Sequence, residues 1–210
     1  STQGGLTIGN GVQLASNGSM SLSSAFDTTI AGSIRSNNLD IKSDRAFTLS
    51  GYAFSNEELR IASSGIMNIM GNVDSVGSIF LDSKTYQTTI SSNIVANDNI
   101  SVTSGNAIIN GKLASANDSV NIKSMGTLTL NGAVEAIKQI SLDASTVNIS
   151  GTALSEDKLG VKTNYLSLND GGRIDAANEV AITTGTWNNT KAFGTQGSLR
   201  ITANTLTNTD

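Results

Sequence analysis

Short stretches of this chain alternate between aliphatic and polar residues, and the alternation returns about every twenty residues. Each return begins with the five-residue pattern aliphatic-x-aliphatic-x-small. An alternation with a period of two is typical of a β-strand that buries one face. A short strand is therefore predicted at each start of the pattern. The ten starts, 19 to 21 residues apart, are Met20, Leu39, Leu59, Ile79, Ile100, Val120, Ile140, Leu159, Val180 and Leu199.

The fifth residue of the pattern is small in every repeat. It is Ser in the first six repeats and Ala or Thr in the last four. A position that holds only small side chains is expected where the chain turns in a confined space. Each strand is therefore predicted to end at a corner, at Ser24, Ser43, Ser63, Ser83, Ser104, Ser124, Ala144, Thr163, Thr184 and Ala203.

Further apolar residues follow the corner and predict two more strands per repeat. A second apolar pair occurs at Phe47/Leu49, Ile66/Ile69, Leu128/Leu130, Val147/Ile149 and Leu166/Leu168. A glycine follows at Gly32, Gly51, Gly71, Gly111, Gly132, Gly151 and Gly171, where a turn would use positive φ or a close backbone approach. The third strand carries an apolar residue at Ile34, Val73, Ile94, Leu113, Val134, Leu154 and Ile174.

Three short strands cannot bury their apolar face within one repeat, but stacked repeats place each aliphatic side chain over its counterpart. The sequence therefore predicts an all-β fold, a parallel β-helix of about ten coils with about 20 residues per coil. Strand twist and the hand of crossover connections favour a right-handed coil. We expect residues 1–210 to form one domain, with a partial first coil at 1–19 and an irregular coil at 180–198.

The composition excludes several classes of function. The 210 residues contain no Cys, no His and no Pro. Disulfides, metal sites built on thiolate or imidazole ligands, and Ser-His-Asp triads are therefore excluded. With 13 Lys and Arg residues against 17 Asp and Glu, the net charge of −4 argues against a nucleic-acid surface. No run of hydrophobic residues exceeds three, whereas a membrane-spanning helix needs about 20, so no membrane insertion is expected.

Catalysis by a β-helix would require acids and bases from neighbouring coils to stack into one cluster. At the outward position three residues after each start, Asp143 lies between Lys123 and Lys162. An isolated carboxylate between ammonium groups is typical of a surface ladder, and differs from a paired-carboxylate or Ca²⁺ site. The sequence therefore predicts no catalytic residue, no metal and no cofactor.

The most irregular repeat offers the candidate binding residues. Residues 186–193 (TWNNTKAF) replace the second apolar pair and include the only Trp of the chain. An exposed Trp or Phe on the side of a solenoid would anchor a partner, so Trp187, Lys191 and Phe193 are candidate contacts. The alternative interpretation places Trp187 in the core, because it lies seven residues after its repeat start, as Leu166 does.

Several phrases of the chain resemble filamentous-haemagglutinin repeats: residues 119–124 (SVNIKS), 127–132 (TLTLNG) and 198–209 (SLRITANTLTNT). Such repeats build the shafts of large bacterial exoproteins exported by two-partner secretion, among them adhesins and effectors of contact-dependent growth inhibition. The resemblance runs from about Leu6 to Asp210, and autotransporter passengers are a near competitor. The chain lacks the Asn-Pro motifs of the family's secretion domain and the Val-Glu-Asn-Asn motif that precedes many toxins. We therefore expect an internal fragment of a larger exoprotein.

The resemblance implies a structural and presentation shaft that displays adhesive or toxin segments to target cells. It also implies a secreted or cell-surface location and an outer-membrane transporter as the partner during export. Two alternatives stay open: a receptor-binding adhesin segment, whose partner is a receptor on the target cell, and a carbohydrate-active β-helix. A cut solenoid exposes unpaired strand edges, so some end-to-end self-association is also expected.

Overall fold

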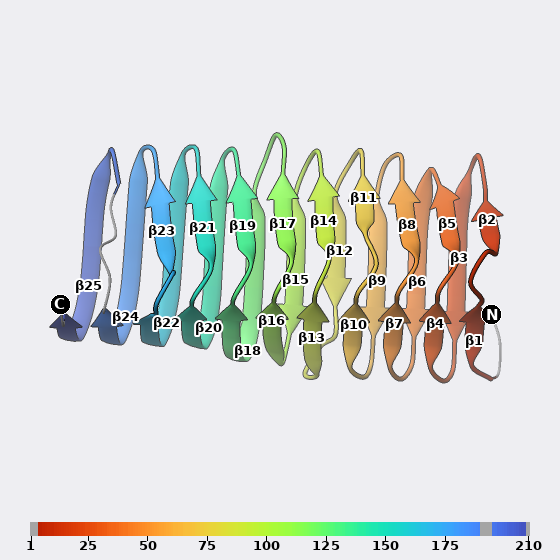
Figure 1. Cartoon of the computed structure of the whole chain (residues 1–210), viewed down its shortest axis with the longest axis horizontal. Helices are drawn as coiled ribbons and strands as arrows, with labels where there is room; N and C mark the ends of the chain where they lie inside the picture. The colour runs from red at the N-terminus through yellow and green to blue at the C-terminus, as the bar shows by residue number, and fades with distance from the viewer. Residues whose placement is uncertain (1–3, 190–194, 209–210) are drawn as a thin grey trace.

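The computed structural model describes residues 4–189 and 195–208, and every helix or strand assigned in these ranges is a β-strand. The strands form two sheets, one of 16 strands and one of nine. Neighbouring strands in both sheets run parallel and belong to successive repeats. The protein is therefore a parallel β-helix of about ten coils, as the sequence predicts (Figure 1).

Each coil has up to three straight legs, and each leg carries one of the apolar columns. The separate first-leg strands are β3 (Ser19–Ser24), β6 (Asn38–Ser43), β9 (Leu59–Ser63), β12 (Ile79–Asp82) and β15 (Ile100–Ser104). The separate second-leg strands are β1 (Leu6–Ile8), β4 (Thr28–Ile30), β7 (Phe47–Leu49), β10 (Met67–Ile69), β13 (Gln87–Ile90) and β16 (Asn106–Ile109).

Later coils join the first and second legs into one strand of 11 residues. These long strands are β18 (Val120–Leu130), β20 (Gln139–Ile149), β22 (Lys158–Leu168), β24 (Glu179–Asn189) and β25 (Ser198–Asn208). The third legs form the nine-stranded sheet: β2 (Gln13–Ala15), β5 (Ser33–Ser36), β8 (Tyr52–Ser55), β11 (Val73–Ser75), β14 (Asn93–Ala96), β17 (Lys112–Ser115), β19 (Ala133–Ala136), β21 (Thr152–Ser155) and β23 (Arg173–Ala176).

The register places the predicted starts directly opposite one another. Ile79 pairs with Ile100, Ile100 with Val120, and Val120 with Ile140. The variable repeat length is absorbed at the corners, so the apolar columns stay aligned along the stack. In Figure 1 the chain advances from right to left, while the third legs rise in front and the first legs descend behind them. This path is right-handed, in agreement with the preference set by strand twist.

The inward side chains form one continuous core that runs the length of the stack. In the middle coils these residues are fully buried, as Leu81, Val102 and Ile122 show with exposed fractions of 1%, 0% and 1%. The last coil is different, because Leu199 is 46% exposed at the end of the stack. Stacking on both sides is therefore what removes the apolar columns from water.

Two residues of the predicted columns face outward. Ile66 is 47% exposed, and Met67 takes the inward place, because the corner before this leg contains one more residue than in the coils of β20, β22 and β24. Leu154 is half-buried on the outer face, and Ala153 is the inward residue of its leg. In both places the large aliphatic residue is next in sequence to the position that faces the core, so its side chain points to the outer face.

The glycine column marks the line along which successive backbones come closest. A Cβ atom on Gly51 would lie 1.9 Å from the carbonyl oxygen of Gly32, and one on Gly132 would lie 1.9 Å from that of Gly111. Close approach, rather than backbone conformation, therefore requires glycine at these positions. The column shifts by one residue near its end: Gly171 has a φ of 83°, and Gly172 takes the position of close contact.

Buried hydroxyls link the coils at two of the corners. At the predicted corner after the first leg, Ser43 Oγ donates to the carbonyl of Phe26 at 2.8 Å and Ser124 Oγ to that of Gly105 at 2.9 Å. A second column, which the repeat pattern did not indicate, lies at the end of the third leg, where Ser55 Oγ donates to the carbonyl of Asn37 at 2.6 Å. Small polar residues fit these corners because their hydroxyls satisfy backbone carbonyls of the preceding coil.

Candidate functional site

The three residues expected to bind a partner fall into two groups. Trp187 is fully buried and pairs in register with Leu166 on one side and Leu206 on the other. It therefore occupies the core, as the alternative interpretation holds, and its indole is not a surface anchor. Lys191 and Phe193 lie outside the described residues.

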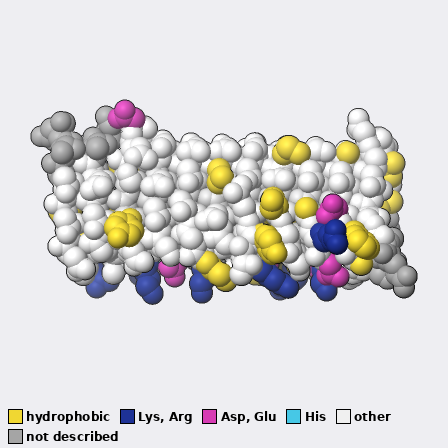
Figure 2. Space-filling model, turned by 90° about the horizontal axis from the view of Figure 1, so that it is seen from below, with side chains coloured by type: hydrophobic (Ala, Val, Ile, Leu, Met, Phe, Trp, Pro, Cys, Tyr) yellow, Lys and Arg dark blue, Asp and Glu magenta, His cyan; other side chains and the backbone are white. Residues whose placement is uncertain are grey.

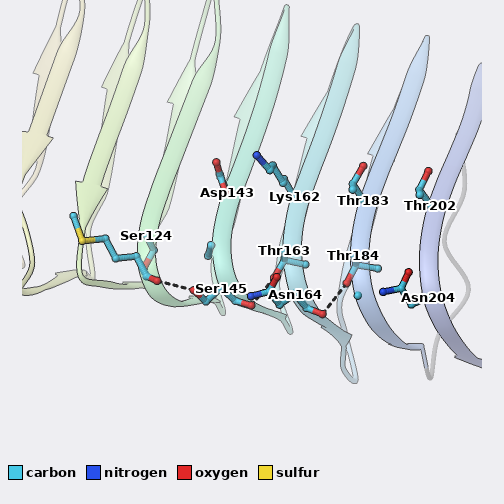
Figure 3. Close-up of a pocket in the computed structure, with 13 residues that line it drawn as sticks. Ser124, Asp143, Ser145, Lys162, Thr163, Asn164, Thr183, Thr184, Thr202 and Asn204 are labelled. Atoms are coloured by element: carbon cyan, nitrogen blue, oxygen red, sulfur yellow. Dashed lines mark hydrogen bonds between the residues drawn. The ribbon is translucent and has the colours of Figure 1, made fainter.

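A groove on the outside of the last coils is the strongest candidate site in the described part of the chain. It follows the corner between the first and second legs from β18 to β25 and has a volume of about 540 Å³. Figure 3 shows two rows of side chains along it. One row contains Asp143, Lys162, Thr183 and Thr202, and the other contains Met125, Ser145, Asn164, Gly185 and Asn204.

The local fold explains why the groove forms here. Between the two rows lies the inward residue of each corner, such as Thr163 in β22 and Thr184 in β24, which is small and buried. Because the chain bends around this residue, the outward side chains before and after it diverge. The backbone between them stays uncovered, and it forms the floor of the groove.

Hydrogen bonds between consecutive coils hold this floor in place. The Ser145 hydroxyl donates to the carbonyl of Met125 at 2.7 Å, and Thr163 Oγ1 donates to the carbonyl of Ser145 at 3.1 Å. Thr184 Oγ1 continues the series by donating to the carbonyl of Asn164 at 3.4 Å. The shape of the groove is therefore fixed before any ligand arrives.

The charges of the groove are few and adjacent. Asp143 lies in register with Lys123 on one side and Lys162 on the other, and it is the only carboxylate among the lining residues. Hydrolysis of a glycosidic bond ordinarily requires two carboxyl groups facing the same bond. The described residues also contain no group of three or more Asp or Glu side chains placed to hold a metal ion. The arrangement is suited to hydrogen bonding.

No family model, curated protein or solved structure matches this chain. The resemblance to filamentous-haemagglutinin repeats therefore rests on the sequence pattern and stays a prediction.

The first coils carry a different kind of surface, in which arginines cover aromatic rings of neighbouring coils. Among the described residues three such pairs lie at 4.3 to 4.7 Å from guanidinium carbon to ring centroid: Arg35 over Phe54, Arg45 over Phe26 and Arg60 over Phe80. Arg35 and Phe54 lie directly opposite each other in adjacent strands, as do Arg60 and Phe80. These pairs were not predicted, although their one-repeat spacing could have indicated them.

Tyr52 extends this surface on the nine-stranded sheet. Its ring stacks on that of Phe54 at 6.5 Å between centroids, and its hydroxyl donates to Asp74 Oδ2 at 2.9 Å. Partial burial and the hydrogen bond to Asp74 raise the pKa of Tyr52 to about 12. The contacts tie three successive coils together on their outer face, which is a structural role.

The outer surface seen from below is polar, with hydrophobic side chains scattered across it and Lys and Arg side chains gathered along one long edge (Figure 2). Three of the most exposed large hydrophobic residues, Ile66, Met125 and Tyr165, lie in separate coils. This face carries no broad apolar patch of the kind that marks a stable protein interface. Within the described ranges there is also no helix of the length and hydrophobicity that crossing a bilayer requires.

Proposed function

We propose that this chain is a segment of the structural and presentation shaft of a secreted bacterial surface exoprotein, which displays adhesive or toxin segments to target cells. The single observation that carries this proposal is the uninterrupted parallel pairing from β3 to β25 around one core. Each additional coil lengthens such a stack by about 4.8 Å, so a longer chain reaches further from the point where it is anchored.

The contacts between coils support a mechanical role. Parallel backbone hydrogen bonds, the buried hydroxyls of Ser43 and Ser124, and the aromatic pairs all join one coil to the next. Force applied along the long axis of the stack is therefore shared among the many bonds that join each pair of neighbouring coils. Such a stack needs no disulfide and no metal to remain extended.

The same architecture supports a role in export. Each coil presents a complete template of backbone donors and acceptors on which the next coil can form. An unfolded chain that emerges from an outer-membrane transporter, the proposed partner, would fold one coil at a time. Each new coil would bury apolar surface outside the cell and so favour onward movement of the chain.

The shaft proposal makes a direct prediction for the isolated chain. Fluorescently labelled protein should show no saturable binding to target cells. Saturable binding would instead favour the receptor-binding adhesin segment and would contradict a passive shaft. The carbohydrate-active alternative predicts release of reducing ends from an acidic polysaccharide, which the single carboxylate of the groove does not favour.

A second experiment tests presentation itself. The chain is placed on a bacterial surface between an outer-membrane anchor and a terminal receptor-binding domain. Deletion of residues 139–157 removes one whole coil in register, because Gln139 lies opposite Lys158, and should preserve capture of receptor-coated beads. Deletion of residues 139–148 removes half a coil and should abolish capture. Loss of capture in the whole-coil deletion would contradict the proposal.

A further inference from the structure

We propose that the groove from β18 to β25 binds an extended, uncharged glycan chain that lies parallel to the long axis of the stack. This function goes beyond the shaft and requires no cleavage of the ligand. Three features of the groove support this ligand: the composition of its two rows, their spacing and the preformed floor.

The polar side chains of the groove suit sugar hydroxyls. Asn164 and Asn204 are exposed, and each amide offers both donors and acceptors. Thr183 and Thr202 are exposed opposite them and add hydroxyls that also donate and accept. Sugar hydroxyls need partners of both kinds, whereas a phosphate or carboxylate polymer needs donors and positive charge.

The charge of the groove favours an uncharged polymer. Its one ammonium group, on Lys162, lies in register with its one carboxylate, on Asp143. Lys123 is also in register with Asp143, on its other side, so these three side chains leave one uncompensated positive charge. A nucleic acid or a polyuronate would need many more.

The spacing of the coils matches a polymer that runs along the axis. Equivalent side chains in neighbouring coils lie about 4.8 Å apart, which is close to the length of one pyranose unit in an extended glycan. Successive sugar units would therefore meet successive residues of each row, which are polar at every position except Met125 and Gly185. Gly185 leaves a gap between Asn164 and Asn204, which provides room for a ring within that row.

An exposed aromatic residue comes directly after this row in the sequence, although it is not one of the residues that line the groove. Tyr165 follows Asn164 in β22 and is 60% exposed. The apolar face of a sugar ring stacks readily on such a side chain, which combines a flat hydrocarbon surface with a polar tip. Because the floor is already held by hydrogen bonds, binding would pay little for ordering the site.

The test measures binding of the full chain to four hexasaccharides by saturation-transfer NMR and calorimetry. Cellohexaose, laminarihexaose and maltohexaose are the uncharged probes, and hexagalacturonate is the charged probe of equal length. We expect at least one uncharged probe to bind, with little change between low and high salt. Asn164→Ala and Asn204→Ala should each weaken its binding by about 2- to 10-fold.

Two further variants control the interpretation. Lys162→Met removes the one ammonium group of the lining and should weaken binding of the uncharged probe by no more than the loss of one hydrogen bond, about 2- to 10-fold and independent of salt. Asn148→Ala changes an outward residue of β20 outside the groove and should leave binding unchanged. Circular dichroism verifies that every variant keeps its fold.

Three outcomes would overturn the proposal. The first is that no uncharged hexasaccharide binds. The second is binding of hexagalacturonate alone, lost in Lys162→Met and at high salt. The third is binding that both asparagine variants leave intact, which would place the ligand elsewhere. None of these outcomes bears on display by a shaft. Because glycan binding would itself give saturable binding to cells that carry the glycan, the coil deletions are the test that separates the two proposals.

Discussion

The early and late coils of the stack share one core but differ at the corner between the first and second legs. In the coil of β6, three residues separate the inward Ser43 from the inward Phe47. In the coil of β22, two residues separate Thr163 from Leu166, and the strand continues through the corner. The inward residues that follow the corner are buried in spite of this difference, and Leu49 is an example.

The corner can therefore change length while the core columns stay buried, and the coil of β18 keeps the three-residue corner although its first and second legs form one strand. The longer corner supplies side chains that fold over the neighbouring coil, as Arg45 does over the ring of Phe26. The shorter corner has no such residue, so the groove stays open beside Asn164. Cohesion of the early coils is therefore reinforced from outside, whereas the late coils expose their outer backbone.

The largest effect is expected where the two regions are alike, at the glycine column. Gly51→Ala in an early coil and Gly151→Ala in a late coil each place a Cβ atom 1.9 Å from a carbonyl oxygen of the preceding coil. Each should lower the free energy of unfolding by about 4 kcal/mol or more. Gly160→Ala is the matched control, because its Cβ would meet nothing closer than 4.0 Å. Urea denaturation measures all three, and an equal effect at Gly160 would refute the close-approach explanation.

The next largest loss of stability is expected in the late coils alone. Trp187→Leu leaves a cavity at a fully buried site and should cost about 1–3 kcal/mol of unfolding free energy. Amide exchange should accelerate in β24 and β25 and stay unchanged in β6 and β9. Tyr165→Leu, at a neighbouring exposed position, should change stability by no more than about 0.5 kcal/mol. A stable Trp187→Leu variant would contradict the assignment of the indole to the core.

Lengthening a late corner tests the comparison directly. One glycine inserted between Asn164 and Tyr165 reproduces the corner length of the early coils. The pairing of β18 with β20 already accommodates a register shift between Ser124 and Thr127, so we expect a loss of only about 1–2 kcal/mol. The same insertion between Val161 and Lys162 would reverse which side chains face the core. It should unfold the late coils, as measured by amide exchange, and tolerance of it would undermine the stacked register.

Removing an arginine–aromatic pair should have a smaller effect, limited to the early coils. A double-mutant cycle with Arg60→Gln and Phe80→Leu is expected to give a coupling of about 0.5–1 kcal/mol. The cycle is needed because Arg60 also pairs with Glu58. A coupling of zero in urea denaturation would show that these contacts do not reinforce the early coils.

The smallest effect is a pH dependence at Tyr52. Its pKa is raised from 10.0 to about 12, so the neutral phenol is favoured in the folded state. The resulting stability is fully present below pH 10 and is lost as the pH rises to about 12. Asp74→Asn should lower the pKa of Tyr52 towards its ordinary value, because it removes the negative charge of the hydrogen-bond partner. Ultraviolet titration of phenolate absorbance measures both proteins, and an unchanged pKa would contradict the assigned cause.

The columns of the core could be predicted from the sequence because they depend on two counts alone, the two-residue alternation and the twenty-residue repeat. The prediction was wrong for Ile66 and Leu154, which face outward because each lies next in sequence to the position that faces the core. The buried position of Trp187 followed from the same spacing. The alternation carries no information about small polar residues, so the hydroxyl column that includes Ser55 was missed.

The groove could not be predicted in the same way. Its residues, such as Asn164 and Thr183, are ordinary surface residues in the sequence. They become a site only because the bend separates the rows on either side of it, with two corner residues in the coils of β20, β22 and β24 and three in that of β18. That angle depends on the path of the backbone in three dimensions, whereas the spacing of apolar residues reports only on the inward face.

The close packing along the glycine column also affects the deamidation of two Asn-Gly sequences. Asn-Gly sequences deamidate when the glycine nitrogen attacks the asparagine side chain. At Asn110–Gly111 and Asn131–Gly132 that nitrogen donates to a carbonyl of the preceding coil, at 3.1 and 2.9 Å. The two asparagine side chains are also joined to each other at 2.9 Å. Two sequences that would be short-lived in a flexible chain are thereby protected from spontaneous damage.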